Sequence, residues 1–299
     1  VIQQQVSDKD SSSSDSQTAS EEGQDSQSSS STSSSGSTGT QGNDDNEMSA
    51  PKNLSFKNVT FKKEGEYDTG KKYNYIQAMD FAKGYYYIVT YNYLENSKND
   101  NSLIKLNSNF KTVKKSENIL SGNKITGITV SDDNDLYLSY HEENKVRVYD
   151  ANTLKSKSTK KIGNIGSSTN AISYDEANKR YVIKNGDLKN FSVVNKDGKV
   201  IKKITRRNSG DNGQDMCVVG DYIVELMFNT SSVDIYSISK GKFLRNEKIT
   251  YKGNPAFGPN ADFEPEGICQ ISDNEFMISV ARTLDSGNRG IIFYKGTIK

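Results

Sequence analysis

The side chains best suited to chemistry recur in five copies of one short phrase. Each copy is a polar residue, then a small or acidic residue, then Met or Ile: Gln77-Ala78-Met79, Thr126-Gly127-Ile128, Asn170-Ala171-Ile172, Gln214-Asp215-Met216 and Glu266-Gly267-Ile268. Glu264 lies two residues before the last copy and adds a further carboxylate. Amides, hydroxyls and carboxyls of this kind bind a polar ligand, coordinate a hard cation or transfer protons.

A metal site in this chain would be built from oxygen ligands. His141 is the only histidine and lies in a polar turn, so we exclude nitrogen-rich zinc sites and expect a surface histidine. No cofactor is certain. The composition allows Ca²⁺ or Mg²⁺, held by Glu266, Asn170 and Asp215, with Glu264 beside them.

No catalytic residue is assigned by the sequence, and Asp215, Glu264 and Glu266 are the candidates. Two carboxyls about 5–10 Å apart could hydrolyse a glycosidic bond. Trp is absent, so Tyr would have to stack on a sugar. We interpret Tyr91, Tyr93 and Tyr140 as core or rim residues, in preference to a surface that stacks on a sugar. No nucleophile elbow, phosphate-binding loop or dinucleotide fingerprint occurs.

The spacing of the phrase predicts the elements that position these groups. Successive Met or Ile anchors lie 49, 44, 44 and 52 residues apart, a period typical of four-stranded propeller blades. Two apolar, aromatic-rich runs follow each phrase. A more polar fourth strand then closes four of the units: Val113 to Ile119, Ser158 to Ile162, Val200 to Ile204 and Leu244 to Ile249. The alternatives are a β-sandwich and a six-bladed ring.

The fifth unit lacks a fourth strand, since only five residues follow Tyr294. Residues 54 to 62 alternate apolar and polar ahead of the first phrase. We expect this segment to supply the missing outer strand and close the ring. The prediction is an all-β, five-bladed β-propeller whose five phrase residues converge at one end of the central channel.

Residues 1–49 have a different composition from residues 50–299, which we take as the propeller domain. The first segment is rich in Ser, Gln and acids, with nine acids against one Lys, and predicts a disordered linker. No run of eighteen apolar residues and no signal peptide occurs. We expect an exported, extracellular protein tethered to the membrane only through an N-terminal anchor absent from this sequence. The alternative is a cytosolic protein.

Cys217 and Cys269 occupy the same place in adjacent units. We expect two buried, reduced thiols, because equivalent positions on neighbouring strands are usually too far apart for a disulfide, which remains the alternative.

Lysine pairs lie on or after the proposed outer strands, and Arg206-Arg207 follows one of them. We interpret these charges as protection of exposed sheet edges. The alternative is attraction to an anionic cell-envelope polymer. We expect no nucleic-acid partner, because no reader motif accompanies the charge.

Three segments resemble a known group. The runs from Ile128 to Leu138, Asn170 to Asp175 and Glu264 to Ile268 are similar to bacterial extracytoplasmic propellers of the YVTN-repeat and gluconolactonase/strictosidine-synthase-like group. The linker resembles that behind the lipidated Cys of Gram-positive lipoproteins. In gluconolactonase-like members a Glu before Gly, two Asn and an Asp hold a divalent cation for lactone or ester hydrolysis, which implies Glu266, Asn170 and Asp215 here. The chain departs from that pattern at Gln77 and Thr126, and those relatives usually have six blades.

Two functions follow from these observations. The first is a monomeric ligand-binding or scaffold module of the cell envelope, with Gln77, Thr126, Asn170, Gln214 and Glu266 contacting an unknown small molecule or envelope component. The second is a metal-assisted hydrolase of the lactonase or esterase kind, or a glycosidase. In a third interpretation the phrase residues hold loop amides and the ring together.

Overall fold

A computed structural model describes residues 48, 50–51, 53–93, 100–120, 122–141, 143–207, 213–253, 255–256 and 261–299. The described residues all belong to one compact unit, residues 45–299. The predicted disordered linker lies, apart from residue 48, outside the described residues. Within the described part of the chain, no helix is long and apolar enough to cross a membrane.

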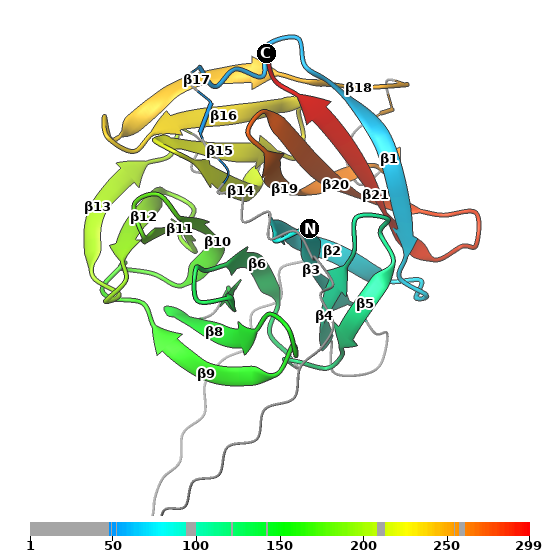
Figure 1. Cartoon of the computed structure of the whole chain (residues 1–299), viewed down its shortest axis with the longest axis horizontal. Helices are drawn as coiled ribbons and strands as arrows, with labels where there is room; N and C mark the ends of the chain where they lie inside the picture. Colours follow the sequence, from blue (N-terminus) through cyan, green and yellow to red (C-terminus); the bar gives the residue numbers. More distant parts are fainter. Residues whose placement is uncertain are drawn as a thin grey trace, which may run out of the picture. The chain divides into compact units, whose positions relative to one another are not determined.

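Five sheets surround a central axis in this unit (Figure 1), and their strands pair antiparallel except for the short parallel pair of β18 and β1. Blades 1 to 4 have four strands each, and strands consecutive in sequence are neighbours in each sheet. Blade 1 comprises β2 (Asn74–Ala82), β3 (Tyr85–Asn92), β4 (Asp100–Leu106) and β5 (Thr112–Ser116); blade 2 comprises β6 (Ile125–Val130), β7 (Asp135–Tyr140), β8 (Lys145–Asp150) and β9 (Ser156–Lys161). Blade 3 comprises β10 (Thr169–Asp175), β11 (Arg180–Asn185), β12 (Asn190–Asn195) and β13 (Val200–Thr205); blade 4 comprises β14 (Gly213–Val219), β15 (Tyr222–Met227), β16 (Ser232–Ser237) and β17 (Lys242–Lys248).

Blade 5 joins the two ends of the domain and confirms the predicted closure. Its order is β18 (Thr250–Tyr251), β1 (Thr60–Asp68), β21 (Arg289–Thr297), β20 (Glu275–Thr283) and β19 (Glu264–Ser272). The early strand β1 runs antiparallel to the last strand β21. A five-bladed propeller closed by an N-terminal strand is therefore the fold.

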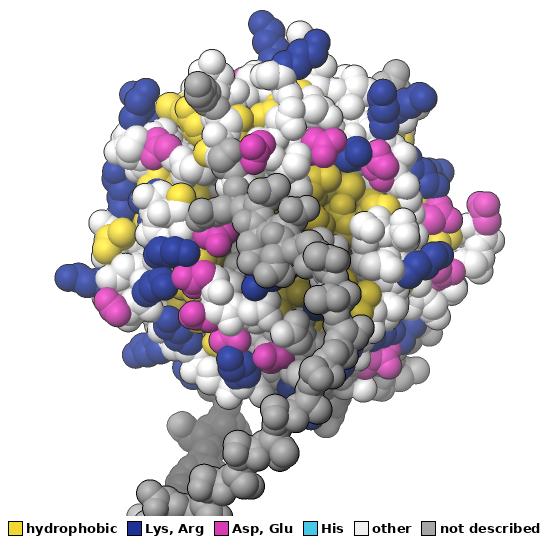
Figure 2. Space-filling view, viewed as in Figure 1, with side chains coloured by type: hydrophobic (Ala, Val, Ile, Leu, Met, Phe, Trp, Pro, Cys, Tyr) yellow, Lys and Arg dark blue, Asp and Glu magenta, His cyan; other side chains and the backbone are white. Residues whose placement is uncertain are grey.

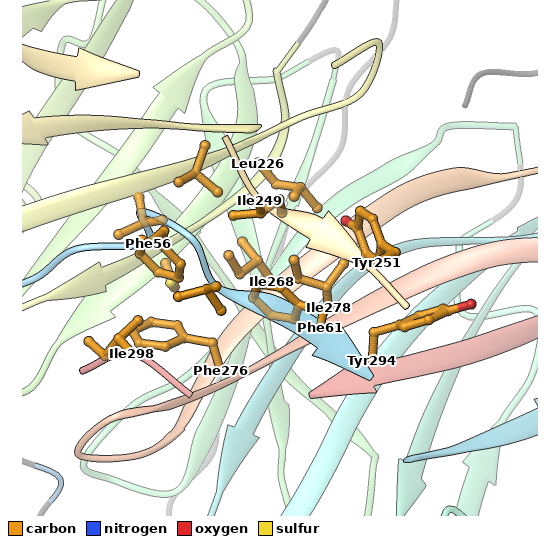
Figure 3. Packing of buried hydrophobic residues seen from close by; sticks show 14 of the residues in the cluster. Phe56, Phe61, Leu226, Ile249, Tyr251, Ile268, Phe276, Ile278, Tyr294 and Ile298 are labelled. Carbon is orange, nitrogen blue, oxygen red and sulfur yellow. The ribbon is translucent and has the colours of Figure 1, made fainter. Parts of the chain in front are cut away.

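The closing strand begins later than predicted, at Thr60 rather than at residue 54. The preceding segment is held by side chains instead of a sheet ladder. Glu247 on β17 accepts hydrogen bonds from the Phe56 backbone N–H and the Ser55 hydroxyl, and Arg245 donates to the Leu54 carbonyl. Alternating apolar residues had suggested a strand here, but they are buried by packing against blades 4 and 5 (Figure 3).

Each hydrophobic cluster is shared by neighbouring blades. Phe56, Phe61, Leu226, Ile268 and Phe276, for example, belong to one cluster between blades 4 and 5 (Figure 3). The remaining clusters link the other four pairs of neighbours around the ring. Burial of apolar surface, which is the main stabilising term, therefore occurs between blades and not within them.

Candidate functional site

The repeated phrase marks a β-bulge on the innermost strand of every blade. On β2, Ile76 lies opposite Thr90 and Ala78 lies opposite Val89, so Gln77 has no partner residue. Thr126, Asn170 and Glu266 are left out of register in the same way, and on β14 the register shifts between Gly213 and Met216, across Gln214 and Asp215. Bulges re-aim a side chain and often lie beside functional sites.

The small second residue of the phrase reflects the close approach of inner strands. A Cβ added to Gly127 would come within 2.8 Å of the Ala171 Cα and the Ile172 backbone nitrogen. A Cβ on Gly267 would lie 2.9 Å from the Met79 Cβ. Neighbouring inner strands therefore touch at the bulges, which brings the five polar residues to one level of the channel.

Side chains just below the bulges tie each inner strand to the next. Asp80 accepts hydrogen bonds from the Val130 backbone N–H and the Thr129 hydroxyl (2.8 and 2.9 Å). Thr129 in turn accepts from the backbone N–H of Tyr174. Ser173 and Cys217, at the equivalent positions, accept from the backbone amides of Val218 and Gln270. These residues perform a structural role.

Both cysteines are free and buried, as predicted. Burial raises the pKa of the Cys217 and Cys269 thiols well above the ordinary value, so both are neutral, inert groups at physiological pH.

Asp215 occupies the second position of its phrase, where the other copies have Ala or Gly, and its side chain contacts the inner strands of two other blades. Its Oδ2 accepts hydrogen bonds from the backbone N–H groups of Met79 (3.2 Å) and Ile268 (3.4 Å), which belong to blades 1 and 5. The side chain is 1% exposed, and burial raises its pKa well above the ordinary value, against the effect of these amides. Asp215 therefore links three blades at the axis.

Glu266 is the bulge residue of blade 5 and is 7% exposed. Burial raises the pKa of Glu266 to about 8; Lys124 opposes the shift, and Glu264 and Asp215 contribute to it. The carboxyl is consequently protonated at pH 7 and can donate a hydrogen bond, which a carboxylate cannot.

Glu264 belongs to an ion-paired group beside Glu266. Arg289 donates to Glu264 (3.0 Å) and to Asp262, and its guanidinium lies 4.4 Å from the Tyr75 ring centroid. Burial raises the pKa of Glu264, and Arg289 counteracts this effect. Arg289 and Lys124 were not predicted as site residues, because neither belongs to a phrase; the fold brings them close to Glu264 and Glu266.

The other phrase residues make local contacts. The Gln77 amide donates to the Ile76 carbonyl (2.9 Å), and the Thr126 hydroxyl donates to the Asn170 carbonyl. Asn170 is buried and Gln214 is half-buried. The structure therefore places all five residues at the bulges, with their ligand-binding role still a prediction.

The aromatic and histidine predictions are confirmed. Tyr91 and Tyr140 are buried, and Tyr93 is exposed at the rim, edge-on to Tyr91 and Tyr75. His141 is exposed.

No three His, Cys, Asp or Glu side chains come together as a metal-binding group in the described residues. Glu266, Asn170 and Asp215 provide oxygen atoms, but Asp215 Oδ2 is engaged by two backbone amides. The Ca²⁺ or Mg²⁺ site at these residues stays a prediction.

The interpretation of Arg206-Arg207 as edge protection is wrong. Arg206 is buried and pairs with Glu225 (2.6 Å), which also lies 3.8 Å from the buried Lys184, and Arg207 pairs with Asp234 (2.9 Å). Buried carboxylates of blade 4 require such partners. The lysine pairs do lie on outer strands β5, β9 and β13, and Figure 2 shows basic side chains spread around the periphery between acidic ones.

The ring of five sheets with its bulged inner strands defines a β-propeller. No protein-family model and no curated protein matches the chain. Among solved structures, the chain is similar to glutaminyl cyclase of Myxococcus xanthus, with a TM-score of 0.57, 13% identity, and coverage of 81% of this chain and 100% of that one. It is also similar to the tail fibre of Staphylococcus aureus phage P68, with a TM-score of 0.57, 18% identity and coverage of 80% of this chain. The matched region spans 53% of the tail-fibre chain. These likenesses show the fold alone.

Proposed function

We propose that the protein is a binding module that recognises a polar, hydrogen-bonding ligand at the bulged end of the central channel. The convergence of five bulges, each contributing one polar residue, is the observation that carries this proposal. Bulges interrupt the pairing of strands, so sheet formation does not require a ring of them. Their effect here is to place five different side chains around one opening.

The charges at this end favour a ligand that is largely uncharged. Glu266 is protonated at neutral pH, and Arg289 is already paired with Glu264 and Asp262. The groups left for recognition are the Glu266 carboxyl, the amides of Asn170 and Gln214, and Lys124. Such groups complement carbonyl, hydroxyl and amide groups, as found in small metabolites and in the ends of envelope polymers.

The module works outside the cytoplasm in this proposal, as a monomer tethered through residues 1–49. The support is the acidic, Ser-rich composition of that segment and its resemblance to lipoprotein linkers, together with the resemblance of the domain to extracytoplasmic propellers. Surface proteolysis of intact cells expressing the full-length protein tests this part. Protection of the propeller until the cells are lysed would contradict it.

Calorimetric titration with soluble peptidoglycan fragments and neutral sugars tests the binding site. A Gln214→Ala, Glu266→Ala double variant should lose at least tenfold in affinity for the fragment that binds. An Asp285→Asn variant, altered at an exposed carboxyl, is the control. Equal affinity of the double variant and the parent protein would place the site elsewhere.

A second candidate, acid–base catalysis, rests on the pKa of Glu266. A carboxyl with a pKa near 8, close to a second carboxyl in Glu264, resembles the pairs that enzymes use as acid and base. The similar structure from Myxococcus xanthus, a glutaminyl cyclase, is an enzyme on this fold. Turnover of some ester, lactone, glycoside or glutaminyl peptide should then disappear in Glu266→Gln, and a chelator would separate metal-assisted from metal-free hydrolysis. An inert purified protein across this panel would contradict catalysis.

A further inference from the structure

One face of blade 1 carries polar side chains where a buried sheet face normally carries apolar ones. Asn74, Asn92 and Asp100 lie directly opposite one another on β2, β3 and β4. Thr90 and Ser102 form the next opposite pair on β3 and β4. Opposite residues, and residues two apart on one strand, point to the same face of a sheet. These five residues, called the blade 1 polar cluster, are therefore neighbours.

This face is buried against blade 5. It continues with Ile88 and Ile104, which lie opposite each other and pack with Ala281 and Ile291 of blade 5. The exposures within the polar cluster are 1% for Asn74, 0% for Thr90, 4% for Asn92, 7% for Asp100 and 1% for Ser102. The cluster is thus enclosed at the interface between blades.

The cluster has hydrogen-bonding capacity that the described residues do not satisfy. Both side-chain polar atoms of Asn74, the hydroxyls of Thr90 and Ser102, and Asp100 Oδ1 are buried without a hydrogen-bond partner in that part of the chain. Leaving such groups unpaired in a protein interior is unfavourable, and each calls for an explanation.

Polar residues near the same end of blade 3 behave differently. Thr169 hydrogen-bonds the Tyr140 carbonyl, Asn185 donates to the Ile165 carbonyl, and Ser192 donates to Asn185. The fold can therefore satisfy polar side chains in this position with its own groups. In blade 1, four of the five polar side chains of the cluster keep buried polar atoms that have no partner in the described residues.

We propose that the blade 1 polar cluster binds a calcium ion. One carboxylate, amide oxygens and two hydroxyls are hard oxygen ligands, and water can complete the six to eight positions that Ca²⁺ takes. Mg²⁺ fits less well, because it demands strict octahedral geometry and gives up its waters reluctantly. With a single carboxylate, the affinity belongs to the weak range of about 10⁻⁴–10⁻³ M that extracellular modules use.

The charge around the cluster is compatible with a cation. Arg289 lies on β21 of the facing blade, with its guanidinium over the ring of Tyr75, which adjoins Asn74 in sequence. Its charge is neutralised by Asp262 and Glu264. This site is separate from the oxygen ligands predicted at Glu266, Asn170 and Asp215, and it does not depend on the proposed function.

Thermal unfolding in the presence and absence of calcium tests the proposal. At 10 mM Ca²⁺ the Tm should rise by roughly 3–5 °C, as expected for a millimolar site on a domain of this size. Mg²⁺ at the same concentration and NaCl at the same ionic strength should give less than a third of that rise. Asp100→Asn, which keeps the size of the side chain, should abolish the calcium effect, whereas Asp285→Asn should retain it.

Terbium luminescence provides an independent measurement. Tb³⁺ takes the same oxygen ligands and emits when a nearby tyrosine is excited; the chain has no Trp, and Tyr75 and Tyr91 adjoin Asn74 and Asn92 in sequence. We expect saturable emission that Ca²⁺ displaces. The affinity for Tb³⁺ should fall at least tenfold in a Thr90→Val, Ser102→Ala double variant. This double variant also tests the site if Asp100→Asn does not fold. A calcium response that is absent, matched by Mg²⁺, or unchanged in these variants would overturn the proposal and leave buried water as the occupant.

Discussion

At the scale of single residues, the same backbone feature holds two carboxyl groups in different surroundings. Asp215 and Glu266 are both buried carboxyl groups at bulges, and burial raises the pKa of each. Asp215 accepts hydrogen bonds from backbone amides of two other blades. The pKa of Glu266 is shifted chiefly by burial, and then by the charges of Lys124 and Glu264. Asp215 therefore contributes to holding the ring together, and the ligand-binding role of Glu266 stays a prediction.

The pKa of Glu266 predicts a change of stability with pH. Its value of about 8 in the folded state exceeds the unfolded value of about 4.3, so between these pH values the folded state binds more protons. The contribution of this carboxyl to the free energy of unfolding is fully present below about pH 4. It falls as the pH rises toward 8, by up to about 1.4 kcal/mol per pH unit. Urea titrations of the parent protein and Glu266→Gln between pH 5 and 8 measure this, and parallel curves would contradict it.

Close packing of the inner strands predicts a steric effect at Gly127. In Gly127→Ala the new Cβ meets backbone atoms of β10, which cannot move aside, and we expect a loss of about 2–3 kcal/mol. Ala78→Gly, at the same position of blade 1, should cost only about 1 kcal/mol. Chemical denaturation compares them; equal stability of Gly127→Ala and the parent protein would show that the strands are further apart.

At the scale of elements, the sequence predicted blades well and their contacts poorly. Every blade has the same bulge on its inner strand, so the phrase recurs and reveals the period. The start of the closing strand was misplaced because Leu54 and Phe56 alternate like a strand although they are buried by side-chain packing. The pairing of Arg206 with Glu225 and the blade 1 polar cluster both depend on strand register, which the spacing of phrases does not contain.

The closing element should carry a large share of stability. Phe61 is fully buried on β1 and packs in the cluster between blades 4 and 5 (Figure 3). Phe61→Ala should cost about 3–5 kcal/mol, while Ile201→Ala on the exposed outer strand β13 should cost less than about 0.5 kcal/mol. Urea midpoints report both, and similar losses would mean that the closure contributes little.

The buried charges between blades 3 and 4 should be intolerant of a missing partner. Glu225→Gln keeps the shape but leaves Arg206 and Lys184 without their carboxylate, and we expect a loss of about 3–5 kcal/mol. Glu66→Gln, at an exposed ion pair with Lys63, should cost less than about 1 kcal/mol. Comparable losses from the two would show that the buried pair is not essential.

At the scale of the whole molecule, no blade has a core of its own. Each hydrophobic cluster is shared by two neighbours, and the ring is closed by pairing β1 with β21. We therefore expect the described domain to unfold in one transition. Tyrosine fluorescence and far-ultraviolet circular dichroism should give coincident urea curves, and separate midpoints would indicate a blade that unfolds independently.

The pairing of β1 with β21 also sets an order of events during synthesis. Asp68 is the last residue of β1 and Arg289 is the first residue of β21. The ribosome therefore adds 221 residues (289 − 68) after β1 is complete to reach the start of β21. At about 5–20 residues per second, β1 waits roughly 10–45 s for its partner. During this interval the ring stays open, and the edge of β1 that pairs with β21 has no partner strand.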